Sequence, residues 1–325
     1  MKRFLRIPSG DRRAAFIFAA RADRVARADD LTAEAAFARY EDIRPRLPRS
    51  AFLQGSVACG GLREVAEHVD AFVLDGFGVL TVGETAIPGA PACIRDLRAR
   101  GKRLVVLTNA ASYPHAQAVA QYRRLGFDFA PEEIVSSRDV CARRLPGLLP
   151  GAHWGAIAAP NDRFEDIPVD MVRWTARDAP AVDGFAMLST AAFDAADYDT
   201  LESALRARPR PVVVANPDLV APWETGLSKE PGFFAHLLAD RLGIAPVFFG
   251  KPHADAFADA LARLGDPPPA RCAMVGDTLH TDILGGRAMG LRTVLATDHG
   301  LFAGRDPGRF IAASGIVPDF IVPAP

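Results

Sequence analysis

The sequence predicts an α/β protein that consists of a doubly wound parallel sheet and a second, smaller α/β unit inserted into it. Three observations lead to this prediction. From Asp70 onward, an apolar run, a polar turn residue and a helix opened by Pro and closed by Gly follow one another several times. About a hundred residues separate the second of these units from the third, which is the size of a small domain. Apolar residues make up 49% of the 325 residues, so the chain can bury a large core.

The first 65 residues precede this pattern. Residues 1–65 are rich in Ala and Arg and are predicted to form a helical extension, whose purpose the sequence does not show. A helix is expected from Thr32 to Arg44, because two prolines follow within four residues and prevent its continuation. The tract AAFIFAA at 14–20 weakly resembles a signal peptide, but charged residues follow it at once, and a short amphipathic segment is the better interpretation.

The first two repeating units are complete. The first consists of the apolar run AFVL, then Asp75, then a helix expected between Pro88 and Gly101. The second consists of RLVVL, then Thr108, then a helix expected to end near Gly126. This order is typical of a strand followed by a helix that returns the chain to a parallel neighbouring strand.

Two later units repeat the order. The run VFFG precedes Lys251 and a predicted helix, and CAMVG precedes Asp277 and another. A fifth apolar run, RTVLA, follows. Right-handed crossovers would place all five runs in one parallel sheet. In such sheets chemistry gathers beyond the carboxyl ends of the strands, where the polar residues that end these runs are expected to meet.

The predicted domains are an N-terminal extension at 1–65, a core at 66–112 and 217–325, and an inserted cap at 113–216. Within the cap, WGAIAA, DGFAMLS and PVVVAN are expected strands, and a helix is expected from Tyr198 to Arg208. Because the chain enters and leaves the cap beside the predicted site, the cap is expected to act as a lid.

The residues at the strand ends suit phosphoryl transfer. An Asp that attacks a phosphate dianion meets charge repulsion, which a divalent cation and fixed donors neutralise. Asp75 and Asp277 would bind Mg²⁺ through oxygen. Lys251 would supply a positive charge, and Thr108 would donate hydrogen bonds to the oxygens of the transferred group. Asp282 would orient Lys251 or a metal-bound water from a second layer.

These residues occur in four motifs: FVLDGFGVL, LTN at 107–109, GKP at 250–252 and VGDTLHTD at 275–282. Together they resemble, in order, the motifs of the haloacid dehalogenase-like (HAD) hydrolase superfamily. The segment VVVANPDLVAP, followed by GFFAHLLADRLG, is similar to the subclass IIA branch, which includes sugar-phosphate, nucleotide and nitrophenyl phosphatases. The resemblance covers about residues 68–300 and implies a Rossmann-like HAD core with an α/β cap inserted between the second and third motifs.

The resemblance also implies roles for single residues. It implies that Asp75 is a nucleophile that forms an aspartyl-phosphate, that Thr108 binds phosphate and that Lys251 stabilises charge. It further implies a metal site made by Asp75, Asp277 and the backbone carbonyl of Phe77.

Three polar residues match family positions near the cap hinge: Asn109, Asn216 and Asp218. Substrate contacts and ordinary turn chemistry are equally expected for them.

The sequence departs from the family at one position. In the phosphatases of the family, the residue two beyond the nucleophile is a second Asp that moves the proton of the leaving group. Here it is Phe77, whose phenyl ring transfers no proton, and loss of such a group costs about a hundred- to ten-thousandfold in rate. Glu84 and His280 are substitutes to test, although a turn residue and a solvated loop residue, respectively, are the better interpretations.

Three functions therefore stay open. The first, and the one predicted here, is Mg²⁺-dependent hydrolysis of a small phosphorylated substrate with a good leaving group or another proton donor. The second is hydrolysis of a carbon–halogen bond, since the superfamily's dehalogenases carry an aromatic residue at this place; the GDxxxxD arrangement and the late cap insertion speak against it. The third is a non-catalytic protein that binds a phosphorylated ligand or another protein.

The charge balance excludes a general attraction to polyanions. Lys and Arg number 38 against 39 Asp and Glu, so neither nucleic acid nor an anionic membrane is an expected partner. No apolar run approaches the roughly 20 residues of a membrane-spanning helix. The four cysteines form no CxxC pair. A cytoplasmic enzyme is expected; the resemblance implies that the cap can take part in homodimer contacts, and it leaves the oligomeric state and the substrate open.

Overall fold

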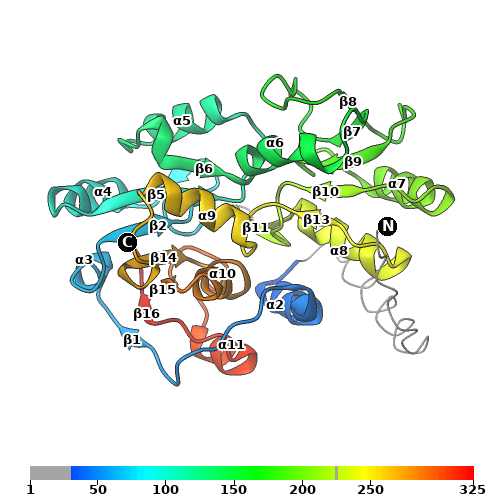
Figure 1. Cartoon of the computed structure of the whole chain (residues 1–325). Helices are drawn as coiled ribbons and strands as arrows, with labels where there is room; N and C mark the ends of the chain where they lie inside the picture. Colours follow the sequence, from blue (N-terminus) through cyan, green and yellow to red (C-terminus); the bar gives the residue numbers. More distant parts are fainter. Residues whose placement is uncertain (1–30, 224–225) are drawn as a thin grey trace, which may run out of the picture.

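The computed structural model describes residues 31–223 and 226–325. The tract at 14–20 that weakly resembles a signal peptide lies outside these residues. Two parallel sheets with helices packed on them make up most of the molecule, and the second sheet lies to the upper right of the first in Figure 1. The predicted fold class, a doubly wound parallel sheet with a second α/β unit, is confirmed. Among the described residues, no helix is both long and apolar enough to cross a membrane.

The first sheet has seven strands. In spatial order they are β1 (Val57–Ala58), β16 (Phe320–Val322), β15 (Arg292–Ala296), β14 (Cys272–Gly276), β2 (Ala71–Leu74), β5 (Arg103–Thr108) and β6 (Ile134–Ser136). The second sheet has five strands, in the order β13 (Val247–Phe248), β10 (Val212–Val214), β9 (Gly184–Met187), β7 (Trp154–Ile157) and β8 (Met171–Arg173). All neighbours within each of these sheets are parallel.

Two short antiparallel hairpins stand apart from the sheets. They are β3–β4 (Thr81–Val82 and Thr85–Ala86) and β11–β12 (Val220–Trp223 and Gly226–Lys229). The described helices are α2 (Ala33–Ile43), α3 (Leu62–Val65), α4 (Ala90–Ala99), α5 (His115–Arg124), α6 (Ser137–Leu148), α7 (Ala195–Ala207), α8 (Pro231–Leu242), α9 (Ala254–Arg263), α10 (Leu284–Ala288) and α11 (Pro307–Ser314), and a π-helical turn at Leu279–Ile283 precedes α10.

Helices cover both faces of the first sheet, as the doubly wound arrangement requires. Alternate strand residues point to opposite faces. Val73 and Met274 therefore pack with α6 and α9, while Phe72 and Val275 pack with α3, α4 and α5. The cluster on the α6 and α9 side continues through Trp154 into the second sheet, so the two sheets share buried apolar contacts.

The predicted helix from Thr32 to Arg44 is observed as α2. The hydroxyl of Thr32 accepts a hydrogen bond from the backbone N–H of Ala35 (3.1 Å), which satisfies a free donor at the helix start. The buried face of α2, with Tyr40 and Ile43, packs in one apolar cluster with residues of α10 and α11 (Figure 1). This helix is therefore part of the folded body and lies against the last strands of the first sheet.

One predicted strand lies in the other sheet. The run VFFG was expected beside the strands of the first sheet, but β13 pairs with β10 at the edge of the second, with Val247 opposite Val213. This part of the prediction was wrong, because an apolar run indicates a strand without indicating which sheet it joins. Lys251 follows three residues after β13.

The division into extension, core and cap stays a prediction. Strand β6 falls in the segment 113–216 predicted as cap, but it pairs with β5 in the first sheet. Strand β13 falls outside that segment and belongs to the second sheet. In the predicted extension 1–65, β1 lengthens the first sheet beside β16.

A buried ion pair joins the segment after β7 to helix α6. The guanidinium of Arg138 pairs with Asp162 (2.5 Å) and Asp166 (2.7 Å) and donates a hydrogen bond to the carbonyl of Ala111 (3.1 Å). The side chains of Arg138 and Asp162 are both 0% exposed. Each charge therefore depends on the other for the interactions that water would otherwise supply.

Replacing Arg138 by Met should lower the free energy of unfolding by about 3–5 kcal/mol, because Asp162 would stay buried without its counter-charge. The matched control is Arg143→Met, which removes a partly exposed ion pair of α6 with Asp259 and should cost less than about 1 kcal/mol. Chemical denaturation followed by circular dichroism measures both. Equal losses in the two variants would contradict this account.

Candidate active site

Neighbouring strands bring three predicted site residues together. Asp75 follows β2, Thr108 ends β5 and Asp277 follows β14, and β2 lies between the other two strands. Because all three strands are parallel, their carboxyl ends lie at the same edge of the sheet. All three side chains are buried.

Lys251 links two of the carboxylates. Its ammonium group forms ion pairs with Asp75 and with Asp282, the latter at 2.7 Å. Lys251 is 1% exposed and Asp282 is fully buried. Asp282 thus lies where it can orient Lys251, and it does so without lining the pocket.

The acidic residues can hold a metal ion. Asp75, Asp277 and Asp282 each offer an oxygen, and these atoms lie within 4.8 Å of one another. The backbone packs closely around Asp277. Oδ2 of Asp277 accepts a hydrogen bond from the N–H of Leu301 (2.7 Å). A Cβ added at Gly300 would lie 2.1 Å from the Cβ of Asp277. Buried oxygen donors held this tightly fit a hard cation such as Mg²⁺.

Glycine at position 78 also serves this arrangement. Gly78 has φ +77, a left-handed conformation, and a Cβ there would lie 2.6 Å from the carboxylate of Asp277. A side chain at this position would be strained and would displace the carboxylate. The loop after Asp75 can therefore approach Asp277 only through a glycine.

Burial dominates the electrostatics of the site. It raises the pKa of Asp75, although the Lys251 ammonium acts in the opposite direction. Burial, with the nearby Asp282 carboxylate, raises the pKa of Asp277 to about 7. Burial acts to lower the pKa of Lys251, but the surrounding carboxylates, led by Asp282 and Asp75, raise it above its usual value. The ammonium therefore stays charged, and a bound cation would favour the ionised carboxylates.

Asn109 ties the end of β5 to the segment 216–218, where the hinge of the cap was predicted. Its Nδ2 donates to the carboxylate of Asp218 (2.9 Å) and to the carbonyl of Lys251 (3.0 Å), and its Oδ1 accepts from the N–H of Lys251 (2.8 Å). The backbone N–H of Asp218 in turn donates a hydrogen bond to Oδ1 of Asn216 (3.0 Å). Asn109 therefore fixes the backbone that carries Lys251.

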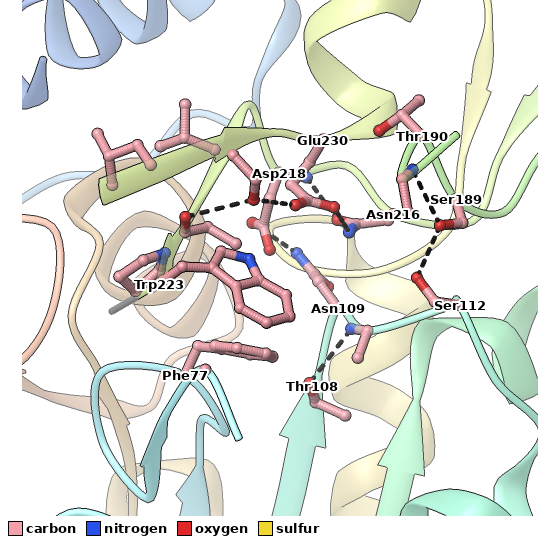
Figure 2. A pocket seen from close by; sticks show the side chains of 18 of the residues that line it. Phe77, Thr108, Asn109, Ser112, Ser189, Thr190, Asn216, Asp218, Trp223 and Glu230 are labelled. Carbon is pink, nitrogen blue, oxygen red and sulfur yellow. Dashed lines mark hydrogen bonds between the residues drawn. The ribbon is translucent and has the colours of Figure 1, made fainter. Parts of the chain in front are cut away.

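A pocket of about 910 Å³ lies over these residues, between the first and second sheets. Of the predicted site residues, Asp75, Phe77, Thr108, Asn109, Asn216, Asp218 and Asp277 line it. Lys251 and Asp282 are buried and are not among its lining residues. Figure 2 shows how the lining side chains from the first sheet, the hinge and the second unit face one space.

Three polar residues of this pocket were not predicted from the sequence: Ser112, Ser189 and Glu230. Ser189 follows β9 and forms a hydrogen bond with Ser112 across the gap between the sheets (2.9 Å; Figure 2). Glu230 accepts hydrogen bonds from Ser228 (2.5 Å) and from Asn216 (3.0 Å). Burial raises the pKa of Glu230. The strand-end rule, applied to DGFAMLS as it was to the core, would have found Ser189.

Phe77 lies against an aromatic residue of the hairpin. Its ring centroid is 6.1 Å from that of Trp223, at an angle of 46° between the planes. Trp223 is 41% exposed and lines the pocket. The hairpin β11–β12 therefore stands directly beside the position where the family's phosphatases carry their second Asp.

The two proton-transfer substitutes named from the sequence lie in different places. Glu84 lines the rim of the pocket, with a 73% exposed side chain 3.9 Å from Arg124. His280 is not a solvated residue as expected: it is 1% exposed, and its Nε2 lies 2.5 Å from Glu41. Helix α2 covers it, with Tyr40 stacked on the ring at a centroid distance of 5.0 Å. His280 does not line the pocket.

Comparison with known proteins agrees with this geometry. Residues 72–164 match the model of the haloacid dehalogenase-like hydrolase family, and residues 248–320 match a second model of HAD-like hydrolases. The chain is 33% identical to the glycerol-3-phosphate phosphatase of Gallus gallus, over 83% of this chain and 93% of that protein.

Solved structures show the same relationship. A protein from Cytophaga hutchinsonii described as a possible sugar phosphatase is 26% identical, with a TM-score of 0.74 over 83% of this chain and 98% of that chain. The glycerol phosphate phosphatase of Mycobacterium tuberculosis in complex with magnesium is 27% identical, with a TM-score of 0.62 over 79% of this chain and 75% of that chain. With its motifs, its fold and these relatives in agreement, the chain belongs to the haloacid dehalogenase-like hydrolases, among relatives named as phosphatases.

Proposed function

We propose that this protein is a Mg²⁺-dependent phosphatase that cleaves a small phosphate monoester through nucleophilic attack by Asp75. The observation that carries the proposal is the buried group formed by Asp75, Asp277, Asp282 and Lys251 at the floor of a pocket. The names of the relatives support a small phosphorylated substrate. The second sheet and its helices would act as the cap over this pocket.

The residues divide the chemistry among them. Asp75 lines the pocket and faces an incoming phosphorus atom, while Lys251 holds its carboxylate in place and reduces the repulsion of the phosphate dianion. The hydroxyl of Thr108 and the N–H groups after β5 would donate to the phosphate oxygens. A bound Mg²⁺, held by Asp75, Asp277 and the Phe77 carbonyl, would neutralise the remaining negative charge.

The same geometry argues against carbon–halogen hydrolysis. Attack on carbon by an Asp does not involve a phosphate dianion and needs no cation. Here Asp277 is fixed by Leu301 and Asp282 by Lys251, so two further carboxylates are buried beside the nucleophile. Burying carboxylates costs free energy unless something compensates it, and a metal site supplies that compensation.

The pocket's polar side suggests how the rest of the substrate is held. Ser112, Ser189, Asn216 and Glu230 offer hydroxyl, amide and carboxyl groups to it. These groups suit a substrate with several hydroxyls. Asn109 and Asp218 would contribute to the hinge side of the same surface.

Asp75→Asn should abolish Mg²⁺-dependent hydrolysis of p-nitrophenyl phosphate, a loss on the order of a thousandfold or more, because an amide is a poor nucleophile. Release of nitrophenolate, followed by absorbance with and without Mg²⁺, measures it. Asp70→Asn is the matched control, since Asp70 precedes the same strand at its opposite end and pairs with Arg271. Native activity that survives Asp75→Asn would refute the assignment of the nucleophile.

Asp277→Asn should weaken Mg²⁺ binding by at least about tenfold, because it removes one of the carboxylate ligands and its charge. Titration calorimetry of the free protein with MgCl₂ measures this directly. Chelation with EDTA should stop turnover by the native chain, and added Mg²⁺ should restore it. Unchanged affinity in Asp277→Asn would exclude this carboxylate from the metal site.

A further inference from the structure

The site needs a proton donor that Phe77 does not supply. When an unactivated ester is cleaved, the leaving oxygen departs as an alkoxide unless an acid protonates it, and water later needs a base. This need follows from the proposed function. The pocket therefore has to be searched for another group that can hold and release a proton at the leaving oxygen.

Three carboxyl groups other than the metal-site residues line the pocket: Glu84, Asp218 and Glu230. Glu84 is largely exposed at the rim, beside Arg124. Glu230 uses both of its oxygens, one with Ser228 and one with Asn216, and lies at the start of α8. Asp218 uses only Oδ1, which accepts the hydrogen bond from Asn109. Among the described residues, none donates a hydrogen bond to its Oδ2.

Asp218 also lies in the right part of the pocket. Its partner Asn109 directly follows Thr108, the residue proposed to bind phosphate, and also holds the backbone of Lys251. A single hydrogen bond therefore joins Asp218 to the residue beside Thr108. It stands just before β11, the strand that carries Trp223 against Phe77. Figure 2 shows Asp218 beside Asn109, with Trp223 and Phe77 facing the same space.

The surroundings of Asp218 favour a protonated carboxyl. Burial raises its pKa well above the usual value; the Lys251 ammonium opposes this, and the carboxylates of Asp75 and Asp282 add to it. Asp75 has the ammonium in direct contact and Asp218 does not. Burial raises the pKa of both carboxyls, but Asp75 alone of the two contacts the ammonium and belongs to the acidic cluster that can hold a cation, and both partners favour its ionised form. Asp218 has neither partner, so it is the carboxyl of the two that is suited to keep a proton.

We propose that Asp218 is the catalytic acid and base of this site and takes the part that Phe77 leaves open. In the first step, an oxygen of Asp75 bonds to phosphorus while the ester P–O bond breaks, and the leaving oxygen takes the proton of the Asp218 carboxyl. In the second, water attacks phosphorus and gives a proton to the Asp218 carboxylate. The bond from phosphorus to Asp75 breaks, which releases phosphate and returns both residues to their starting forms.

The test is Asp218→Asn, assayed with two substrates. One is glycerol phosphate, which is an alkyl phosphate, and the other is p-nitrophenyl phosphate. An Asn at 218 still accepts the hydrogen bond of Asn109, so the hinge contact is kept. For glycerol phosphate, kcat/KM should fall about a hundred- to ten-thousandfold. For p-nitrophenyl phosphate, kcat/KM should change by less than about tenfold, because nitrophenolate leaves without a proton. The variant should then release a burst of one nitrophenolate per site, since the second step lacks its base.

A second pair of variants tests the role by rescue. In the Asp218→Asn background, Phe77→Asp should restore most of the lost kcat/KM for glycerol phosphate, whereas Phe77→Asn, of similar size but without a transferable proton, should not. Equal losses with the two substrates, no loss with either, or failure of the rescue would overturn the proposal. A native chain inert toward p-nitrophenyl phosphate would overturn the proposed function as well, whereas Asp75-dependent hydrolysis of glycerol phosphate that is unchanged in Asp218→Asn would overturn the inference alone.

Discussion

The buried ammonium group of Lys251 is shared by Asp75 and Asp282 at the floor of the pocket, and the rest of the site is arranged around this contact. Three buried carboxylates close together repel one another, and each has lost its hydration. One ammonium offsets part of that cost, and a divalent cation would offset the remainder. The site therefore favours a cation, and it favours an anionic substrate only when a cation is bound beside it.

The backbone of Lys251 is fixed by the side chain of Asn109. Asn109 receives and gives hydrogen bonds at this residue and reaches on to Asp218 at the hinge. Helix α2 supports the neighbouring segments through Tyr40, whose hydroxyl accepts a hydrogen bond from the N–H of Leu219 (3.0 Å) and whose ring stacks on His280. One helix from the start of the chain thus supports both the hinge and the turn that carries Asp282. This contact gives residues 33–43 a structural purpose that their composition does not reveal.

Much of the fold follows from local sequence patterns. The runs before Asp75, Thr108 and Asp277 are strands of one sheet, and their neighbouring positions bring those residues together. Strand periodicity and turn residues are local, so a single sequence displays them. Which sheet β13 joins depends instead on contacts with a strand more than thirty residues earlier. The burial of His280 depends on α2, more than two hundred residues away. The contact of Trp223 with Phe77 is of the same long-range kind.

The proposed chemistry requires that Asp75 becomes covalently phosphorylated. The most direct measurement mixes the protein with a phosphate monoester and Mg²⁺, quenches with acid within one turnover, and locates the adduct by mass spectrometry of the peptides. We expect one phosphoryl group on Asp75, and none in Asp75→Asn treated in the same way. Turnover without an adduct, or an adduct on another residue, would contradict this account.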